Sequence, residues 1–177
     1  MYPPTLTNAD LANIKIAKEM GVTGVMQPFV RDHRDLECVK EALREAGAED
    51  IRLFAKIENM DGVRKLEELF PAADEIVIAR GDLGNAVHLW DLPGVQRQIS
   101  EKCRAAGKPF MVVTQMLASM ERSPVPTRAE VNDIFHAVMD GAASIMVTGE
   151  TAIGDYPVEV IRYMVNTARS AEKEENR

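Results

Sequence analysis

Short apolar runs rich in β-branched residues recur along the chain, and stretches of helical periodicity separate them. These runs show little alternation of apolar and polar residues, which is typical of parallel strands covered on both faces. They lie at residues 21–30, where the strand ends near Val30, and at residues 51–57, 75–79, 109–113 and 143–147. The pattern therefore predicts five buried strands in a parallel sheet.

Amphipathic helices are predicted in the intervals between these strands. Capping boxes, in which a Thr and an acidic residue three positions later satisfy the first backbone N–H groups, are predicted at Thr7–Asp10 and Thr127–Glu130. Another helix is predicted to begin at Pro157, since proline is favoured in the first helical turn. Further helices are predicted at residues 35–46, 61–70 and 92–106.

This alternation predicts an α/β fold of the parallel (β/α)8 TIM-barrel type, present as a partial barrel of about five βα units. The sequence contains neither a G-x-G-x-x-G fingerprint nor a P-loop, so a dinucleotide-binding fold is disfavoured. At 177 residues the chain is shorter than the roughly 250 residues typical of a complete barrel. We expect residues 1–177 to form a single domain.

The charge and composition of the chain argue against several classes of binding partner. The net charge of -7 and the pI of about 5.1 argue against nucleic acid or an anionic membrane as the main partner. No apolar stretch approaches the roughly 20 residues of a membrane span, and no secretory signal pattern is present. The two cysteines, Cys38 and Cys103, are far apart and are interpreted as reduced thiols. We expect a cytoplasmic protein.

Polar residues follow nearly every predicted strand. In parallel barrels the carboxyl ends of the strands carry the active site, so these residues are candidates for one constellation. They are Lys56 and Glu58, then Arg80, Gly81 and Asp82, then Thr114 and Gln115, then Thr148, Gly149 and Glu150.

Residue type suggests a role for several of these side chains. Glu58 and Asp82 are the best pair of ligands for Mg²⁺, which prefers carboxylate oxygens, although Asp82 can equally cap the helix after it. Lys56 can hold a phosphoryl group or an enolate as a point charge, and it can also be a buried partner of Glu58. Gly81 lets backbone N–H groups approach an anion. Thr114 offers a hydroxyl for proton delivery, or is a strand Thr bonded to the backbone.

Several short segments resemble pyruvate kinase in order and in spacing over nearly the whole chain. The matching segments are Lys56–Asn59, Ala79–Gly84, Ala106–Pro109, Thr114–Leu117, Pro126–Glu130, Met139–Gly141, Gly149–Ala152 and Tyr156–Pro157. Each segment alone is a weak signal, whereas the joint signal is specific. The resemblance implies the C-terminal part of the catalytic barrel of that family, from its fourth strand to its eighth.

The resemblance also implies roles around the transferred phosphoryl group. It implies that Glu58 and Asp82 bind the divalent metal, Mg²⁺ or Mn²⁺. It implies that Lys56 stabilises the phosphoryl group in flight. The backbone around Arg80, Gly81 and Asp82 would receive the carboxylate of phosphoenolpyruvate or pyruvate.

The implied reaction is the glycolytic, Mg²⁺-dependent phosphoryl transfer between phosphoenolpyruvate and ADP, which gives pyruvate and ATP. Thr114 would lie beside the enolate and serve its protonation. Thr148 and Glu150 would support that proton path, with Thr148 standing where the family has Ser. The resemblance also makes K⁺ a possible second cofactor, although the family's phosphate and K⁺ ligands come from its first three barrel strands, which have no counterpart here.

Several departures from the family qualify the implied activity. The first three strands, the lid domain and the C-terminal domain have no counterpart in this sequence, so we expect activity to require those strands from a longer parent chain or a partner subunit. Pro28 stands where the family has Ser, residues 85–89 replace its usual loop, and Phe135-His136 replaces its Ala-Asn. Two alternatives remain open. One is a Mg²⁺-dependent pyruvate-enolate lyase, an oxaloacetate decarboxylase or aldolase, and the other is a non-catalytic barrel subunit or fragment.

Overall fold

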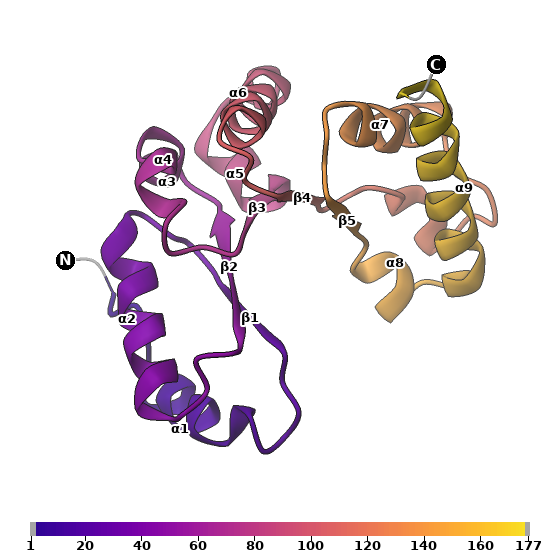
Figure 1. The fold of residues 1–177 in the computed structure, drawn as a ribbon. Helices are drawn as coiled ribbons and strands as arrows, with labels where there is room; N and C mark the ends of the chain where they lie inside the picture. The colour runs from indigo at the N-terminus through magenta and orange to yellow at the C-terminus, as the bar shows by residue number, and fades with distance from the viewer. Residues whose placement is uncertain (1–2, 176–177) are drawn as a thin grey trace.

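The computed structural model describes residues 3–175 and contains one parallel sheet, whose strands follow one another in chain order (Figure 1). The strands are β1 (Gly24–Gln27), β2 (Arg52–Ile57), β3 (Glu75–Ala79), β4 (Phe110–Val113) and β5 (Ser144–Met146). Each pairs in parallel with its neighbour, and β1 and β5 are the two edges of the unclosed sheet. The prediction of a partial parallel β/α barrel is confirmed.

Helices connect every pair of successive strands. Within residues 3–175 the helices are α1 (Asn8–Ala17), α2 (His33–Glu45), α3 (Met60–Arg64), α4 (Leu66–Leu69), α5 (Arg80–Ala86), α6 (Leu92–Ala105), the 3₁₀ helix η1 (Ala118–Glu121), α7 (Arg128–Met139), α8 (Gly149–Ala152) and α9 (Pro157–Glu175). Of these, α1 precedes β1, and α8 and α9 follow β5. No helix within residues 3–175 combines the length and the apolar character that crossing a membrane requires.

Local signals in the sequence explain most helix boundaries. The capping boxes at Thr7 and Thr127 are both formed, and α9 begins at Pro157 as predicted. The helix predicted at residues 61–70 is instead divided into α3 and α4, because Lys65 leaves helical geometry with φ -102° and ψ 17°. The start predicted near residue 35 falls earlier, because the Asp32 carboxylate accepts the Arg34 N–H and caps α2.

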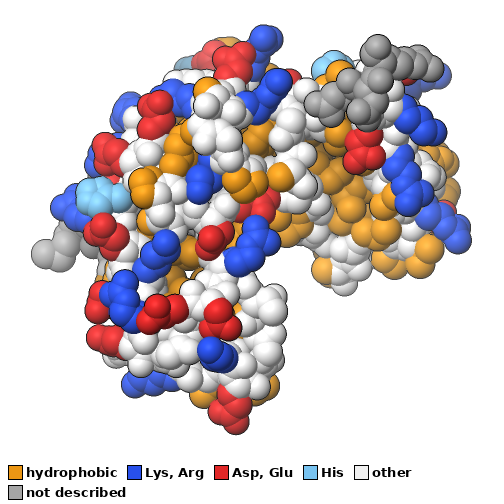
Figure 2. All heavy atoms as spheres, in the orientation of Figure 1, with side chains coloured by type: hydrophobic (Ala, Val, Ile, Leu, Met, Phe, Trp, Pro, Cys, Tyr) orange, Lys and Arg blue, Asp and Glu red, His pale blue; other side chains and the backbone are white. Residues whose placement is uncertain are grey.

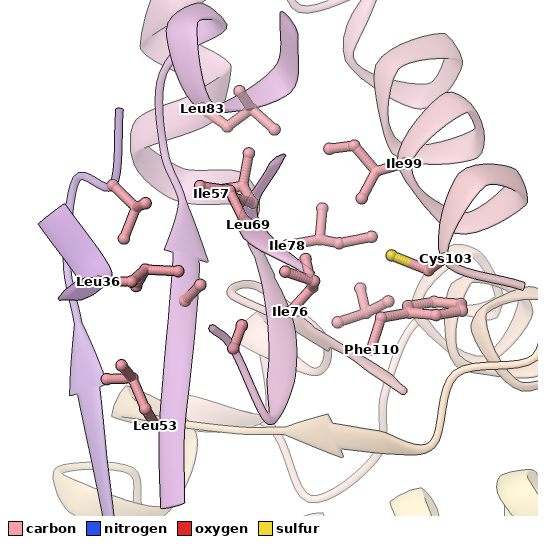
Figure 3. Close-up of a cluster of buried hydrophobic side chains, with 14 of the residues drawn as sticks. Leu36, Leu53, Ile57, Leu69, Ile76, Ile78, Leu83, Ile99, Cys103 and Phe110 are labelled. Carbon is pink, nitrogen blue, oxygen red and sulfur yellow. The ribbon is translucent and has the colours of Figure 1, made fainter. Parts of the chain in front are cut away.

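Alternate residues of each strand face the helices and form the main core (Figure 3). Leu53 and Ile57 of β2 and Ile76 and Ile78 of β3 belong to this cluster, and helical side chains complete it. Those helical residues include Leu36, Leu69, Leu83, Ile99 and Cys103. Burying this many large aliphatic side chains, at about 1.5–3 kcal/mol each, is the main force that holds the helices on the sheet.

The opposite face of the sheet carries a smaller apolar cluster. Val77, Ala79 and Val113 are buried there, and Met111 and Met146 are partly buried against them. Large apolar side chains are also exposed near the end of the chain, at Ile153, Val158 and Ile161. Figure 2 shows hydrophobic side chains gathered over the part of the molecule that holds α8 and α9. The molecule therefore presents apolar surface beside its unpaired edge β5.

Candidate active site

The predicted site residues all lie at or just beyond the carboxyl ends of four adjacent strands. The parallel register pairs Ile57 with Ile78 and Ala79 with Val113, so these ends meet at one edge of the sheet. Lys56 belongs to β2 and Glu58 follows its last residue, Arg80 to Asp82 follow β3, Thr114 follows β4, and Thr148 and Glu150 follow β5. The sheet thus brings to one edge the residues that the sequence predicted there.

Glu58 is buried and held in place from two sides. Its Oε1 lies 2.8 Å from Nζ of Lys56, and its Oε2 accepts the backbone N–H of Phe29 at 2.7 Å. Only 4% of Glu58 is exposed. Phe29 has a left-handed backbone with φ 52°, a conformation that ordinary side chains rarely adopt and that this hydrogen bond helps to hold. Lys56 is therefore the partner of Glu58, as one of the two interpretations of its role expected.

Asp82 is an exposed residue in the first turn of α5. The alternative interpretation of Asp82 as a helix cap is wrong, because Ala79 occupies the capping position and no side chain makes a capping hydrogen bond there. Within the described residues, the carboxylate of Asp82 makes no hydrogen bond or ion pair. Its oxygens are therefore open to a cation.

The donors at this edge fit a hard cation. In the part of the chain that the structure describes, no group of three or more His, Cys, Asp or Glu side chains could hold a metal ion, which disfavours an all-protein zinc site. Mg²⁺ takes one or two protein carboxylates and completes its octahedron with water and substrate. Glu58, oriented by its two partners, and the unpaired Asp82 supply oxygens of the type that Mg²⁺ prefers.

Arg80 points its side chain into the protein. Its guanidinium donates to the carbonyl oxygen of Thr114, at 2.7 Å from Nη2, and lies 2.7 Å from the carboxylate of Asp133 in α7. Nη2 is also 2.8 Å from Sδ of Met116, and the side chain is 12% exposed. With these contacts made, the part of this segment that remains open to solvent is around Gly81, which is exposed.

Gly81 and Thr114 are in direct contact across the ends of β3 and β4. A Cβ atom placed on Gly81 would lie 3.0 Å from Cγ2 of Thr114, so a larger residue would require the threonine to shift slightly. Thr114 has φ 81° and Gln115 has φ 55°, which places both in the left-handed region. Among residues 3–175 the Thr114 hydroxyl has no hydrogen-bond partner, and it remains free to bond a small molecule.

Glu150 ties the loops after β4 and β5 together. Its carboxylate is buried, with 2% of the residue exposed, and accepts the backbone N–H of Leu117 at 3.3 Å and of Thr148 at 2.8 Å. Thr148 itself is exposed. Glu150 therefore fixes the positions of the two loops relative to each other, while Thr148 lies at the surface.

Sequence reasoning missed two contributors to this edge, Phe29 and Asp133. Phe29 acts through its backbone, and Asp133 lies on a helix, 53 residues from the arginine that it contacts. No local sequence pattern marks either residue. A backbone N–H group is present at almost every position, and an acidic residue on a helix usually lies on the solvent-exposed face.

The partial parallel β/α barrel, with polar groups at the carboxyl ends of its strands, places this chain in the class of β/α-barrel proteins. Enzymes of this class carry their active sites at that edge of the sheet. A family model described as "Pyruvate kinase, barrel domain" matches residues 1–161. The chain belongs to the pyruvate kinase family, as the resemblance of its motifs predicted.

Curated relatives agree with this assignment. A pyruvate kinase of Bacillus licheniformis is 42% identical over 170 residues, which cover 96% of this chain and 29% of the relative. One of Clostridium acetobutylicum is 39% identical over 173 residues, covering 98% of this chain and 37% of the relative. One of Dictyostelium discoideum is 42% identical over 169 residues, covering 96% and 33%. The chain thus spans about a third of the length of these relatives.

Proposed function

We propose that this chain forms one wall of a Mg²⁺-dependent site that transfers a phosphoryl group between phosphoenolpyruvate and ADP. The observation that carries the proposal is the Lys56–Glu58 ion pair, fixed at the end of β2. The unpaired carboxylate of Asp82, at the end of the neighbouring strand, complements it. A cation and two carboxylates at one sheet edge suit a reaction in which positioning and charge neutralisation do most of the catalysis.

Glu58 and Asp82 would hold the metal, Mg²⁺ or Mn²⁺. Bound there, the ion would supply charge neutralisation at the substrate oxygens and a template for the reactants. Glu58 reaches that role already oriented, since Phe29 and Lys56 restrict its carboxylate. The Lys56 ammonium is partly exposed and would offset negative charge on the transferred phosphoryl group.

The backbone of Arg80, Gly81 and Asp82 would receive the substrate carboxylate. The exposed Gly81 and the inward-turned side chain of Arg80 support this assignment, because both leave the backbone accessible. As the bond between phosphorus and the enol oxygen breaks and ADP takes up the phosphoryl group, the enolate needs a proton at C3. Thr114, whose hydroxyl is unpartnered within residues 3–175, would deliver it, and Glu150 would hold Thr148 on the same path.

A complete site would require further strands. The unpaired edges β1 and β5, together with the exposed apolar side chains beside them, favour pairing with additional β/α units. A longer chain or a partner subunit can provide those units, and the relatives are about three times the length of this chain. We propose full phosphoryl transfer for that assembly and metal and pyruvate binding for this wall.

Mn²⁺ binding by the purified chain, followed through the electron paramagnetic resonance signal of free Mn²⁺, tests the carboxylate pair. Glu58→Gln and Asp82→Asn should each weaken binding by about tenfold or more, while Glu49→Gln, at an exposed position, should not change it. Equal affinity in all four proteins would overturn the proposal.

The reaction is tested separately by ADP-dependent formation of pyruvate, measured through lactate dehydrogenase, and by exchange of pyruvate methyl hydrogens with D₂O in the presence of Mg²⁺. The exchange requires removal and return of a proton at C3 and needs no nucleotide. Oxaloacetate decarboxylation that is independent of ADP and disappears in Asp82→Ala would instead favour a lyase acting through the same enolate.

A further inference from the structure

The turn after β4 is held in an unusual backbone conformation. Thr114 and Gln115 both have positive φ values, 81° and 55°, although neither is glycine. Such residues cost about 1–3 kcal/mol each and persist only where the surrounding structure holds them. Something outside the turn must therefore supply that restraint.

Arg80 contacts this turn directly at its first residue. Two of its donors converge on the single carbonyl oxygen of Thr114, Nη2 at 2.7 Å and Nε at 3.3 Å. That carbonyl belongs to the peptide group between Thr114 and Gln115, so its direction is coupled to the backbone angles of both residues. A rigid, planar guanidinium is suited to this task, because its donors have a fixed geometry that an ammonium lacks.

Asp133 holds the guanidinium from the other side. Both oxygens of its carboxylate lie close to Nη1 of Arg80, at 2.8 Å and 2.7 Å, and Gln96 Oε1 lies 3.5 Å from the same nitrogen. The Arg80 side chain is 12% exposed and that of Asp133 is 33% exposed, so water screens this pair only in part. Asp133 thus links α7 to the turn after β4 through Arg80.

We propose that Asp133 is a positioning residue for Thr114. Its carboxylate sets the plane of the Arg80 guanidinium, which in turn fixes the Thr114 carbonyl and the left-handed turn that presents the Thr114 hydroxyl. The consequence for chemistry rests on the proposed function, in which Thr114 exchanges a proton with C3 of the enolate. In this arrangement Asp133 acts on Thr114 through Arg80.

Hydrogen–deuterium exchange tests the restraint without reference to activity. Asp133→Asn removes the charge but keeps the size of the side chain. It should speed amide exchange at Leu117, whose N–H is bonded to Glu150, by about tenfold, the loss of one charge-assisted hydrogen bond. Arg80→Lys should have the same effect, because one ammonium cannot reproduce the fork. Asp133→Glu should retain most of the protection, and Asp140→Asn, at the end of the same helix, should leave it unchanged.

Pyruvate methyl exchange in D₂O then tests the link to Thr114. Asp133→Asn should lower the rate at saturating pyruvate by about tenfold or more, with little change in the half-saturating concentration, and Asp133→Glu should recover much of the rate. A purely structural role would not show this separation or this recovery. If Asp133→Asn fails to fold, Arg80→Lys, which breaks the same link to the Thr114 carbonyl, replaces it, and an unchanged rate in Arg80→Lys would contradict the proposal.

The proton chemistry of Thr114 and the positioning role of Asp133 can be contradicted by different results. Absence of methyl exchange in the wild-type protein would overturn the proposed proton chemistry, while amide exchange would still decide whether Asp133 holds the turn. Unchanged amide exchange in Asp133→Asn would overturn the positioning role even if the wild-type protein binds metal and exchanges the methyl hydrogens of pyruvate.

Discussion

Nζ of Lys56 lies 2.8 Å from Oε1 of Glu58, a residue two positions further along the chain. Residues two apart share one face of a strand, so this ion pair runs along the end of β2 rather than between strands. The Glu58 side chain is 2% exposed and that of Lys56 is 25% exposed. The Glu58 carboxylate is therefore almost completely removed from water and is oriented by the Lys56 ammonium. The ammonium itself remains partly accessible to solvent.

Replacing Glu58 by Gln should destabilise the fold. The amide oxygen can still accept the Phe29 N–H, but Lys56 loses its counter-charge. Because Lys56 is partly solvated, we expect a loss of about 1–2 kcal/mol in the free energy of unfolding, below the 3–5 kcal/mol seen when a fully buried pair is broken. Urea unfolding measures this change. In a double-mutant cycle, additive effects of Glu58→Gln and Lys56→Gln would contradict the coupling.

A second buried carboxylate, that of Glu75, forms a hydrogen bond between two strands that are not neighbours in the sheet. Glu75 on β3 accepts the hydroxyl of Ser144 on β5 at 2.5 Å, although β4 lies between the two strands, and its other oxygen is 3.2 Å from Arg52. Two strands separated by a third can be bridged in this way only on the concave side of a strongly curved sheet. The contact therefore reports the curvature expected of a barrel wall.

Ser144→Ala should lower the free energy of unfolding by about 1.5–3 kcal/mol, the usual range for a hydrogen bond to a charged group. Ser170→Ala, at an exposed position in α9, is the matched control and should be neutral or slightly stabilising, since alanine is the better helix former. Equal effects of the two substitutions in urea unfolding would show that the Glu75–Ser144 contact contributes nothing.

Acid should weaken the anchoring of α2. The Arg34 guanidinium holds the pKa of Asp32 well below its ordinary value of 3.8; burial opposes this shift and Lys65 reinforces it. A carboxyl whose pKa is depressed in the folded state adds stability above its unfolded pKa, and that stability is lost as pH falls through the folded value. We therefore expect the free energy of unfolding to fall as the pH is lowered below about 4.

Asp32→Asn tests this assignment. Asn remains a good cap for α2 but cannot ionise, so the variant should be less stable than wild type near neutral pH. The difference should shrink steadily in acid, where the wild-type carboxyl takes up its proton. Unfolding curves collected across the acid range would rule out the assignment if the gap between the two proteins stayed constant.

Local signals predicted the elements well, because capping and strand composition act over a few residues. The capping boxes at Thr7 and Thr127 are formed by side chains three positions apart, and the order of polar groups after each strand follows from the parallel topology. The break at Lys65 was missed, since the apolar spacing of residues 61–70 continues through it.

Long-range partners were not predictable in the same way. Arg80 meets Asp133 and Glu75 meets Ser144 only after helices and strands far apart in sequence have packed. Each of these residues has an ordinary local interpretation, as a surface charge or a strand terminus. The roles of Glu58, Asp82 and Thr114 stay predictions, supported by where the fold brings them.

The two cysteines should differ sharply in reactivity. Cys103 is fully buried on the core-facing side of α6, and burial raises the pKa of its thiol to about 12, while the charge of Lys108 acts in the opposite direction. Cys38 is exposed on α2. Because the thiolate is the reactive form, dithionitrobenzoate at about pH 8 should titrate one thiol in the native protein and both after denaturation.

Cys38→Ser should abolish the native reaction, and Cys103→Ala should leave it intact while lowering the free energy of unfolding through a small cavity next to Ile99 and Phe110. The rate at which Cys103 reacts in Cys38→Ser then measures how often α6 lifts from the sheet. Rapid reaction of Cys103 under native conditions would contradict the packing of α6 shown in Figure 3, because a thiol sealed in this core can react only through opening of the helix.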